Sequence, residues 1–206
     1  LLGSRGLGDV YKRQIDNGSI IFDNNEISKL LVGDIARLGM LRTFQQTRIY
    51  SKMNCVDNMQ ISISHRKDSK DSMFASRKGE IKERAENLLE FVGLYSKRNL
   101  ISGDLSFGQQ KLLEFAMALM NDPKVLLLDE PTAGINPTLI NGLIDRLRKA
   151  NEELGITLCV IEHNMRVIMN LASHIYCLAN GKVLANGSPS ELQKDQRVID
   201  AYLGGH

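Results

Sequence analysis

Two consecutive carboxylates, Asp129 and Glu130, follow the apolar run Val125–Leu128. An unbroken apolar run of this length predicts a strand buried on both faces, as in a parallel sheet. Ligands of open α/β sheets bind beyond the carboxyl ends of such strands. At that position one carboxylate can hold Mg²⁺ and the next can orient an attacking water. Acidic turns after strands are also common in proteins that have no such site.

A second predicted buried strand, residues 156–161, is followed by His163. Its imidazole ring can hydrogen-bond a phosphate oxygen or an attacking water, and it changes its protonation state near neutral pH. The side-chain amide oxygen of Gln45 could similarly reach Mg²⁺ or a water. Taken singly, a histidine is more often structural, and a glutamine such as Gln45 is more often a surface residue.

Ser106 and Gln109 have the spacing of a capping box, and apolar residues continue at helical spacing from there to Met120. A helix N-terminus presents unpaired N–H groups and a positive partial charge, which favour an anion. Ser106 adds a hydroxyl donor, and Gly108 lets the backbone approach a phosphate closely. An ordinary capped helix has the same pattern, so these residues alone leave both interpretations open.

Strands alternate with helices along the second half of the chain, which predicts an α/β layered fold. Asn136 and Pro137 open a helix that ends just before Gly155. The other predicted elements are a strand over 18–23, a helix over 79–91, a short helix over 164–171, a hairpin over 174–185 and a C-terminal helix from 188 to about 203. Residues from about 53 to 121 predict a mostly helical insertion.

Composition excludes several classes of protein. Of 206 residues, 43% are hydrophobic and 24% charged, an ordinary globular balance, and the net charge of +2 gives no case for nucleic-acid binding. No apolar run approaches the ~18 residues of a membrane span. We expect no signal peptide, because residues 1–14 lack a continuous apolar stretch. The three cysteines lack metal-ligand spacing, and their odd number suits a reducing compartment.

The order of these features is similar to that in the ATP-binding-cassette (ABC) ATPases. Leu105–Gln109 resembles the family signature Leu-Ser-Gly-Gly-Gln, with Phe107 in place of the first glycine. Val125–Glu130 resembles the Walker B strand with its glutamate, and Gln45 and His163 match the Q-loop glutamine and the switch histidine. The resemblance covers residues 15–204 and implies a RecA-like P-loop NTPase core, incomplete at its N-terminus, with a helical subdomain over about 53–121.

The resemblance also implies site roles. Two such subunits sandwich two ATP molecules, Asp129 and Gln45 serve Mg²⁺ and its waters, Glu130 polarises the attacking water, and His163 holds the γ-phosphate side. The remaining nucleotide-binding positions implied are Ser106, Phe107, Gly108, Gln109 and Asn136. Of these, Ser106, Gly108 and Gln109 would contact the γ-phosphate of the ATP held by the second subunit. Asn136 stands in the D-loop, where aspartate is usual.

Four segments narrow the resemblance to the ATPase subunit of branched-chain amino-acid importers: Gly39–Gln45, Phe107–Gln110, Glu162–Met165 and Ala201–Gly204. This subfamily implies a second ATPase subunit, identical or different, and transmembrane permease subunits as partners. It also implies a cytoplasmic protein peripheral to the inner face of the membrane. The ATPase of lipopolysaccharide export has the same cassette and a similar C-terminal Tyr-Leu-Gly, and remains an alternative. Soluble ABC ATPases of DNA repair or translation usually carry a second cassette or a long coiled coil, which 206 residues do not hold.

The sequence contains no phosphate-binding loop of the form Gly-x-x-x-x-Gly-Lys-Ser/Thr. The nearest segment is Gly6–Arg13, where Tyr11 replaces the second glycine and Arg13 replaces the hydroxyl residue. Tyr11 would be strained at positive φ, and Arg13 cannot ligate a cation. We therefore expect residues 1–14 to be foreign sequence joined to a truncated ABC ATPase domain, residues 15–206, whose parent is active while this chain is not. A defective cassette that only docks on partners is the alternative.

Overall fold

The computed structural model describes residues 15–43, 48–63 and 74–203. They belong to two compact units, Leu1–Met40 and Leu41–His206, each considered by itself. In the first unit, β1 (Ile21–Phe22) pairs antiparallel with β2 (Asn25–Glu26), and α2 (Val32–Arg37) follows. The strand predicted over 18–23 is wrong in extent, because Asp23 and Asn24 adopt φ values of +49° and +62° and turn the chain.

The second unit is built on a three-stranded sheet in the order β3 (Met40–Arg42), β4 (Val125–Asp129), β5 (Thr157–Ile161). β4 and β5 are parallel, with Val125 opposite Thr157 and Asp129 opposite Ile161. This parallel pair brings the carboxyl ends of both strands to the same edge of the sheet. The predicted parallel arrangement is confirmed for these two strands.

Burial of the two parallel strands differs from the prediction. In β4, Leu126 and Leu128 are buried and the alternate side chains are half-buried, whereas β5 has no fully buried residue. Cys159 and Ile161 are exposed, the latter by 63%. Among the described residues, helices cover the face that carries Leu126, so the expectation of two-sided burial is wrong for β5. Members of the cluster on that covered face are Leu126, Leu128, Leu143, Leu147, Leu158 and Val160.

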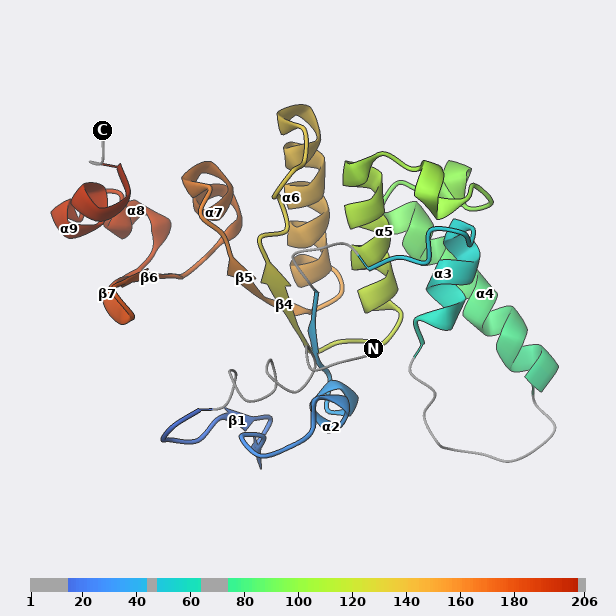
Figure 1. Cartoon of the computed structure of the whole chain (residues 1–206), viewed down its shortest axis with the longest axis horizontal. Helices are drawn as coiled ribbons and strands as arrows, with labels where there is room; N and C mark the ends of the chain where they lie inside the picture. The colour runs from blue at the N-terminus through green and yellow to red at the C-terminus, as the bar shows by residue number, and fades with distance from the viewer. Residues whose placement is uncertain (1–14, 44–47, 64–73, 204–206) are drawn as a thin grey trace, which may run out of the picture. The chain divides into compact units, whose positions relative to one another are not determined.

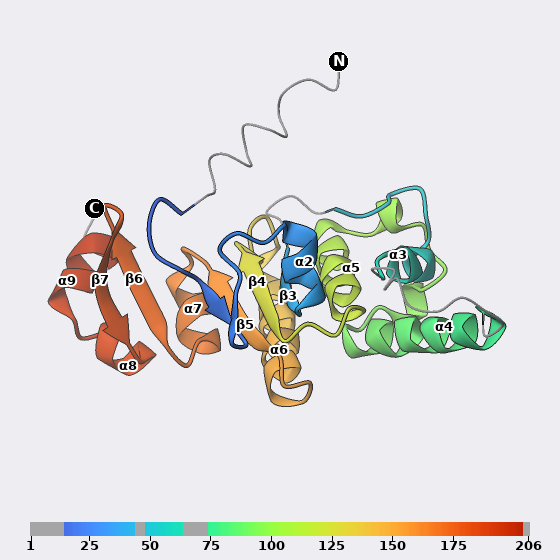
Figure 2. The same ribbon diagram turned by 90° about the horizontal axis from the view of Figure 1, so that it is seen from below.

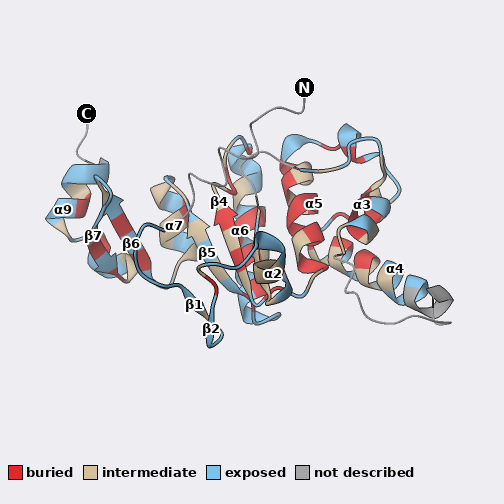
Figure 3. Cartoon of the chain, turned by 60° about the horizontal axis from the view of Figure 1, so that its bottom comes forward, coloured by how far each residue is buried: buried red, intermediate tan, exposed pale blue. Residues whose placement is uncertain are grey.

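Three helices between β3 and β4 lie side by side: α3 (Cys55–Ile61), α4 (Phe74–Phe91) and α5 (Phe107–Leu119) (Figure 1). α4 begins at Phe74, earlier than the predicted residue 79, and α5 begins where the capping box predicted. Two single-turn 3₁₀ helices, Tyr95–Lys97 and Ser102–Asp104, connect α4 to α5. α5 lies between the other two helices and the hydrophobic cluster of the sheet, so it is buried along most of its length (Figure 3).

α6 (Pro137–Glu152) packs its apolar face against the same cluster through Leu143 and Leu147 (Figure 3). Asn136 caps it as predicted: the Asn136 side chain accepts from the Thr138 backbone N–H at 3.1 Å. α6 ends at Glu152, and Gly155 adopts φ +67° on the way into β5. The Asn136 cap therefore fixes the residue at which the loop between β4 and α6 ends and α6 begins.

The C-terminal part contains α7 (Met165–Leu171) and the hairpin of β6 (Ile175–Ala179) and β7 (Lys182–Gly187) (Figure 2). Asn180 and Gly181 form its turn with positive φ, as the Asn-Gly pair predicted. The predicted continuous helix to residue 203 is wrong. The chain forms α8 (Pro189–Leu192), α9 (Gln196–Val198) and a π-helical turn, Ile199–Leu203, because the Asp195 side chain caps a new helix start by accepting from the Arg197 N–H. No helix within the described ranges is long and apolar enough to cross a membrane.

Candidate functional site

Glu130 and His163 lie together at the carboxyl ends of β4 and β5. The Glu130 backbone N–H donates to the Ile161 carbonyl at 2.9 Å, which extends the pairing of the two strands beyond Asp129. His163 Nδ1 lies 3.3 Å from Glu130 Oε1. The imidazole is 74% exposed and the carboxylate 28%, so a ligand can reach both. The structure thus brings a carboxylate and an imidazole ring into contact, and such a pair could serve as a base and a proton carrier.

The backbone at Glu130 adopts φ +47°, a left-handed conformation that is sparsely populated by residues with a side chain. Such conformations cost on the order of 1–3 kcal/mol and persist where surrounding bonds enforce them. Here the Glu130 N–H is bonded to Ile161, and the Glu130 carbonyl accepts from the Ala133 N–H at 3.1 Å. Glu130 therefore sits in a constrained turn that aims its carboxylate at the edge of the sheet.

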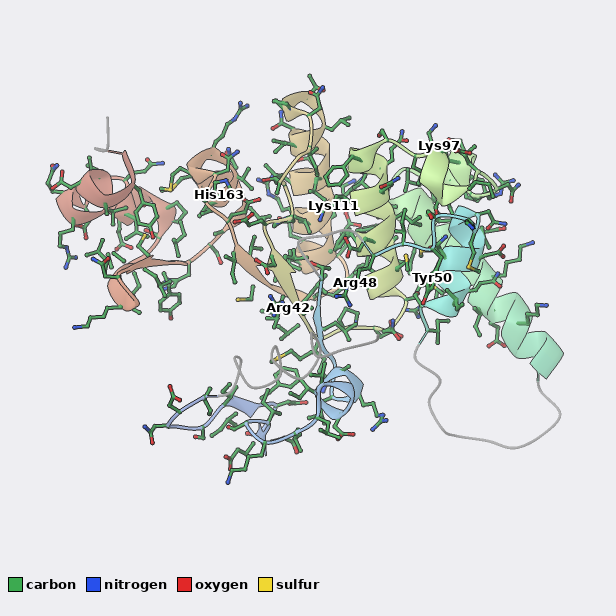
Figure 4. All side chains as sticks on the ribbon, in the orientation of Figure 1. Arg42, Arg48, Tyr50, Lys97, Lys111 and His163 are labelled. Carbon is green, nitrogen blue, oxygen red and sulfur yellow. The ribbon has the colours of Figure 1, made fainter. Side chains whose placement is uncertain are left out.

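Asp129 forms an ion pair with Arg42, at the end of the neighbouring strand β3 (Figure 4). Arg42 Nη2 lies 2.8 Å from Asp129 Oδ2. The pair is half-exposed, since the side chains are 40% and 26% accessible. The carboxylate that was predicted to serve a metal ion is thus partnered by a cationic side chain of the same sheet.

Asp129, a carboxylate at the end of a strand, is the kind of ligand that an open Mg²⁺ site in a nucleotide-binding protein uses. Mg²⁺ is bound in such sites through one or two carboxylates together with substrate phosphates and waters. Within the described ranges no group of three or more His, Cys, Asp or Glu side chains could hold a metal ion, so a closed protein cage is not formed there. A single carboxylate at a strand end is what the open kind of site needs. Gln45, the other predicted metal ligand, lies outside the described residues, as do residues 1–14.

At the start of α5, the capping box predicted from the sequence is present. The Gln109 N–H donates to Ser106 Oγ at 3.4 Å, and the Ser106 N–H donates to Gln109 Oε1 at 3.1 Å. The Ser106 hydroxyl acts in the cap as an acceptor, so its own hydrogen can still be donated to a phosphate. Gln109 uses its carbonyl oxygen in the cap, which leaves the amide NH₂ as the group with which it can contact a ligand.

The first turn of α5 packs on the loop that leads into α6. A Cβ on Gly134 would lie 2.9 Å from Phe107 Cε1, and Gly134 adopts φ +72°. A Cβ on Gly108 would lie 3.1 Å from Leu139 Cδ1. Glycine is required at position 134 because its φ is positive and because the Phe107 ring occupies the space that a Cβ would need. Asn136, in the same loop, uses its side-chain oxygen to cap α6.

Three residues near the carboxylates were not marked as site residues by the sequence: Arg42, Thr132 and Glu162. Glu162 Oε1 accepts from the Thr132 backbone N–H at 2.9 Å and also from the Thr132 hydroxyl. Nearness in sequence to predicted site residues was all that could have suggested a role for them: Arg42 lies shortly before Gln45, and Glu162 directly precedes His163. Spacing along the chain does not tell which distant residue a charged side chain meets.

Comparison with known proteins gives the family. The family described as "ABC transporter" matches residues 9–133, and the family described as "Branched-chain amino acid ATP-binding cassette transporter" matches residues 182–206. The high-affinity branched-chain amino acid transport ATP-binding protein BraF of Pseudomonas aeruginosa is 35% identical over 198 residues, covering 93% of this chain and 78% of BraF. A probable branched-chain amino acid transport ATP-binding protein, LivG of Archaeoglobus fulgidus, is 34% identical over 196 residues, covering 92% and 75%.

Solved structures agree in fold. The ADP conformation of MJ1267, an ATP-binding cassette of an ABC transporter, superimposes with a TM-score of 0.77 at 29% identity, over 93% of this chain and 79% of that one. CbiO1 of Clostridium perfringens, part of the ABC transporter complex cbiONQ, gives a TM-score of 0.77 at 26% identity, over 98% and 82%. The predicted RecA-like α/β core is thereby confirmed. The chain belongs to the ATP-binding cassettes of ABC transporters, in the subfamily named for branched-chain amino acid transport.

Proposed function

We propose that this cassette is the ATP-hydrolysing subunit of an ABC importer for branched-chain or other hydrophobic amino acids. The contact between Glu130 and His163 at the carboxyl ends of the parallel strands carries the proposal, because it joins a general base to a ring that can bind phosphate. The subfamily match and the relatives named for amino acid transport support the class of cargo. The subunit would act at the cytoplasmic face of the membrane, docked on transmembrane permease subunits.

In the proposed reaction, Glu130 Oε1 accepts a hydrogen bond from the attacking water and takes its proton as the water oxygen bonds to the γ-phosphorus. The bond from that phosphorus to the bridging oxygen breaks, and ADP leaves with the bridging oxygen. His163 lies against that carboxylate and donates from its ring to the phosphate side or to the water. Phosphoryl transfer depends mainly on positioning and on electrostatic stabilisation, so the fixed Glu130 turn serves it. Bound to Asp129 and Gln45, Mg²⁺ would neutralise charge on the phosphates.

A second subunit completes the proposed site. The N-terminus of α5, with Ser106, Gly108 and Gln109, would contact the γ-phosphate of the ATP held by that subunit. The positive end of a helix of this length and the donors described above suit an anion. The partner is a second ABC ATPase chain, either identical to this one or different.

We further propose that tight ATP binding needs a phosphate-binding loop that this sequence lacks. Titration of the 206-residue chain with a fluorescent ATP analogue and Mg²⁺ is expected to show no saturable binding up to millimolar concentration. Saturation in the micromolar range would mean that residues 1–14 bind phosphate and would contradict this part of the proposal.

Hydrolysis is tested in a longer parent in which a strand, a phosphate-binding loop and a helix precede Ile15. The parent is expected to release inorganic phosphate from MgATP, whereas the present chain does not. A second candidate function is a non-catalytic cassette that docks on partners, and the absence of a phosphate-binding loop favours it for the present sequence. A parent that binds MgATP without hydrolysing it would favour this second candidate.

A further inference from the structure

A single carboxylate joins the loop that follows β4 to the loop that follows β5. Glu162 Oε1 accepts from the Thr132 N–H at 2.9 Å and from the Thr132 hydroxyl, while Glu162 Oε2 accepts from the Asn164 N–H at 3.4 Å. An ionised carboxylate has acceptors only, and Glu162 meets donors from both loops. Thr132 is 6% exposed, so this end of the contact is shielded from water. Bonds to a charged group in such a place are stronger than neutral ones.

Each side of this contact is close in sequence to one residue of the candidate hydrolytic pair. Thr132 follows shortly after Glu130, and His163 directly follows Glu162. The turn is completed by the Ala133 N–H, which donates to the Glu130 carbonyl, and by the Ile135 N–H, which donates to the Thr132 carbonyl at 3.1 Å. Since Glu130 is held at φ +47°, the bonds around it must oppose its relaxation. Beside the bond from the Glu130 N–H to the Ile161 carbonyl, Glu162 supplies side-chain bonds that attach this turn to the loop bearing His163.

We propose that Glu162 is a positioning residue, whose carboxylate clamps the turn after β4 to the loop after β5 and thereby holds Glu130 against His163. The effect on ATP hydrolysis rests on the proposed function. The clamp itself needs no nucleotide, so it can be tested in the chain as it stands. The chemistry also distinguishes the two ends of the clamp: in Glu162→Gln one oxygen still accepts from Thr132, but the amide NH₂ faces the Asn164 N–H and cannot accept from it.

The direct test records the His163 ring signals by ¹H–¹³C NMR in the full 206-residue chain. In Glu162→Ala these signals are expected to move toward their positions in Glu130→Ala, because in both variants the ring loses its carboxylate neighbour. Amide exchange at Ala133 and Ile135 is expected to rise roughly tenfold or more, the effect of losing a hydrogen bond to a charged group. Thr132→Val, which keeps the N–H and loses the hydroxyl, should shift the ring signals in the same direction by less.

Glu191→Ala is the matched control. Glu191 also accepts from a backbone N–H and a hydroxyl, both of Ser188, but it caps α8 and belongs to the C-terminal segment. Its loss should leave the His163 signals at their wild-type positions. Wild-type His163 signals in folded Glu162→Ala would overturn the clamp. If Glu162→Ala does not fold, Thr132→Val gives the decision: wild-type His163 signals in this variant would overturn the clamp.

A kinetic arm connects the clamp to catalysis. In the longer parent that carries a phosphate-binding loop, Glu162→Ala is expected to lower kcat at least about tenfold with the KM for MgATP unchanged, because the ATP contacts are intact and only the alignment is lost. An unchanged kcat would overturn the positioning role. Absence of hydrolysis in the unsubstituted parent would instead refute the proposed function, while the NMR result on the chain would still decide the clamp.

Discussion

Arg42 Nη2 lies 2.8 Å from Asp129 Oδ2, so neighbouring strands end in an ion pair at the edge of the sheet where Glu130 meets His163. The guanidinium occupies one oxygen of the carboxylate that we assign to Mg²⁺. Any cation that binds there must share Asp129 with Arg42. The positive charge of Arg42 thus offsets the negative charge of Asp129. It thereby reduces the electrostatic repulsion between the adjacent carboxylates of Asp129 and Glu130.

The ion pair should contribute little to stability. Because Arg42 and Asp129 are 40% and 26% exposed, water screens their attraction, and we expect a coupling energy of at most about 1 kcal/mol. A double-mutant cycle with Arg42→Ala and Asp129→Ala, followed by urea unfolding, measures it. The exposed pair Lys82–Glu86, at 3.9 Å, is the comparison and should give a smaller value. A coupling energy well above about 2 kcal/mol would exceed what a solvent-screened pair can supply, and would mean that the pair stabilises the fold substantially.

Asn58 is expected to be among the most sensitive positions of the helical segment. It is fully buried, and its side chain accepts from the Tyr50 N–H at 2.7 Å and donates to Ser102 Oγ at 3.1 Å. It also donates to backbone carbonyls before and at the start of α3. Asn58→Ala leaves buried groups unpaired, at roughly 1–3 kcal/mol each, so the free energy of unfolding should fall by at least ~2 kcal/mol, which urea unfolding measures.

The control for Asn58 is Asn151→Ala, which removes one bond from an exposed side chain to the Ile156 carbonyl. Its effect should stay near or below about 1 kcal/mol. Equal losses in the two variants would contradict the view that Asn58 ties the segment before α3 to the 3₁₀ helix that leads to the α5 N-terminus.

The three thiols should differ sharply in reactivity. Cys159 is exposed on β5, whereas Cys55 and Cys177 are buried, and burial raises the pKa of both buried thiols above the ordinary value. Since the thiolate is the nucleophile, iodoacetamide at mildly alkaline pH should modify Cys159 first and the other two only upon unfolding. Mass spectrometry of the digested chain identifies the sites, and Cys159→Ser is the control. Early labelling of Cys55 would contradict the packing of α3.

The C-terminal caps should weaken in acid. Hydrogen bonds from the Ser188 side chain and backbone lower the pKa of Glu191, and the Arg197 guanidinium lowers the pKa of Asp195. Both carboxylates bind protons less readily when folded, so the stability they contribute is present above their unfolded pKa values and is lost as pH falls through the folded ones. The protection of amides in α8 and α9, measured as the exchange rate relative to the intrinsic rate at the same pH, should therefore fall as the solution is acidified below the ordinary carboxyl range.

Glu191→Gln checks the origin of this acid response. The variant should show lower amide protection in α8 already at neutral pH and a smaller further loss of protection in acid. An acid response identical to that of the unsubstituted chain would assign the effect to other groups.

Local features were predictable from the sequence where one segment contains the whole interaction. The capping box of Ser106 and Gln109 spans a single turn, and the hairpin turn at Asn180 and Gly181 depends on two residues that tolerate positive φ. The meeting of Glu130 and His163 was predictable as well, because parallel strands bring their carboxyl ends to one edge.

The remaining features depend on partners that sequence spacing does not specify. The apolar run in β5 is the same whether one face or two is covered, so the exposure of Ile161 was not foreseen. The C-terminal helix is interrupted because the Asp195 side chain caps a new helix start instead of continuing the preceding helix. Helical periodicity alone does not predict this cap. Likewise, the partners of Arg42 and Glu162 lie far along the chain and are selected by the fold.

The most direct test of the account is Glu130→Gln in the parent that carries a phosphate-binding loop. The substitution keeps the size of the side chain and removes the base, so we expect kcat to fall roughly 10²–10⁴-fold with MgATP binding retained. Glu191→Gln, made in parallel, should leave the rate unchanged. Hydrolysis by Glu130→Gln at the rate of the unsubstituted parent would contradict the assignment of Glu130 as the base.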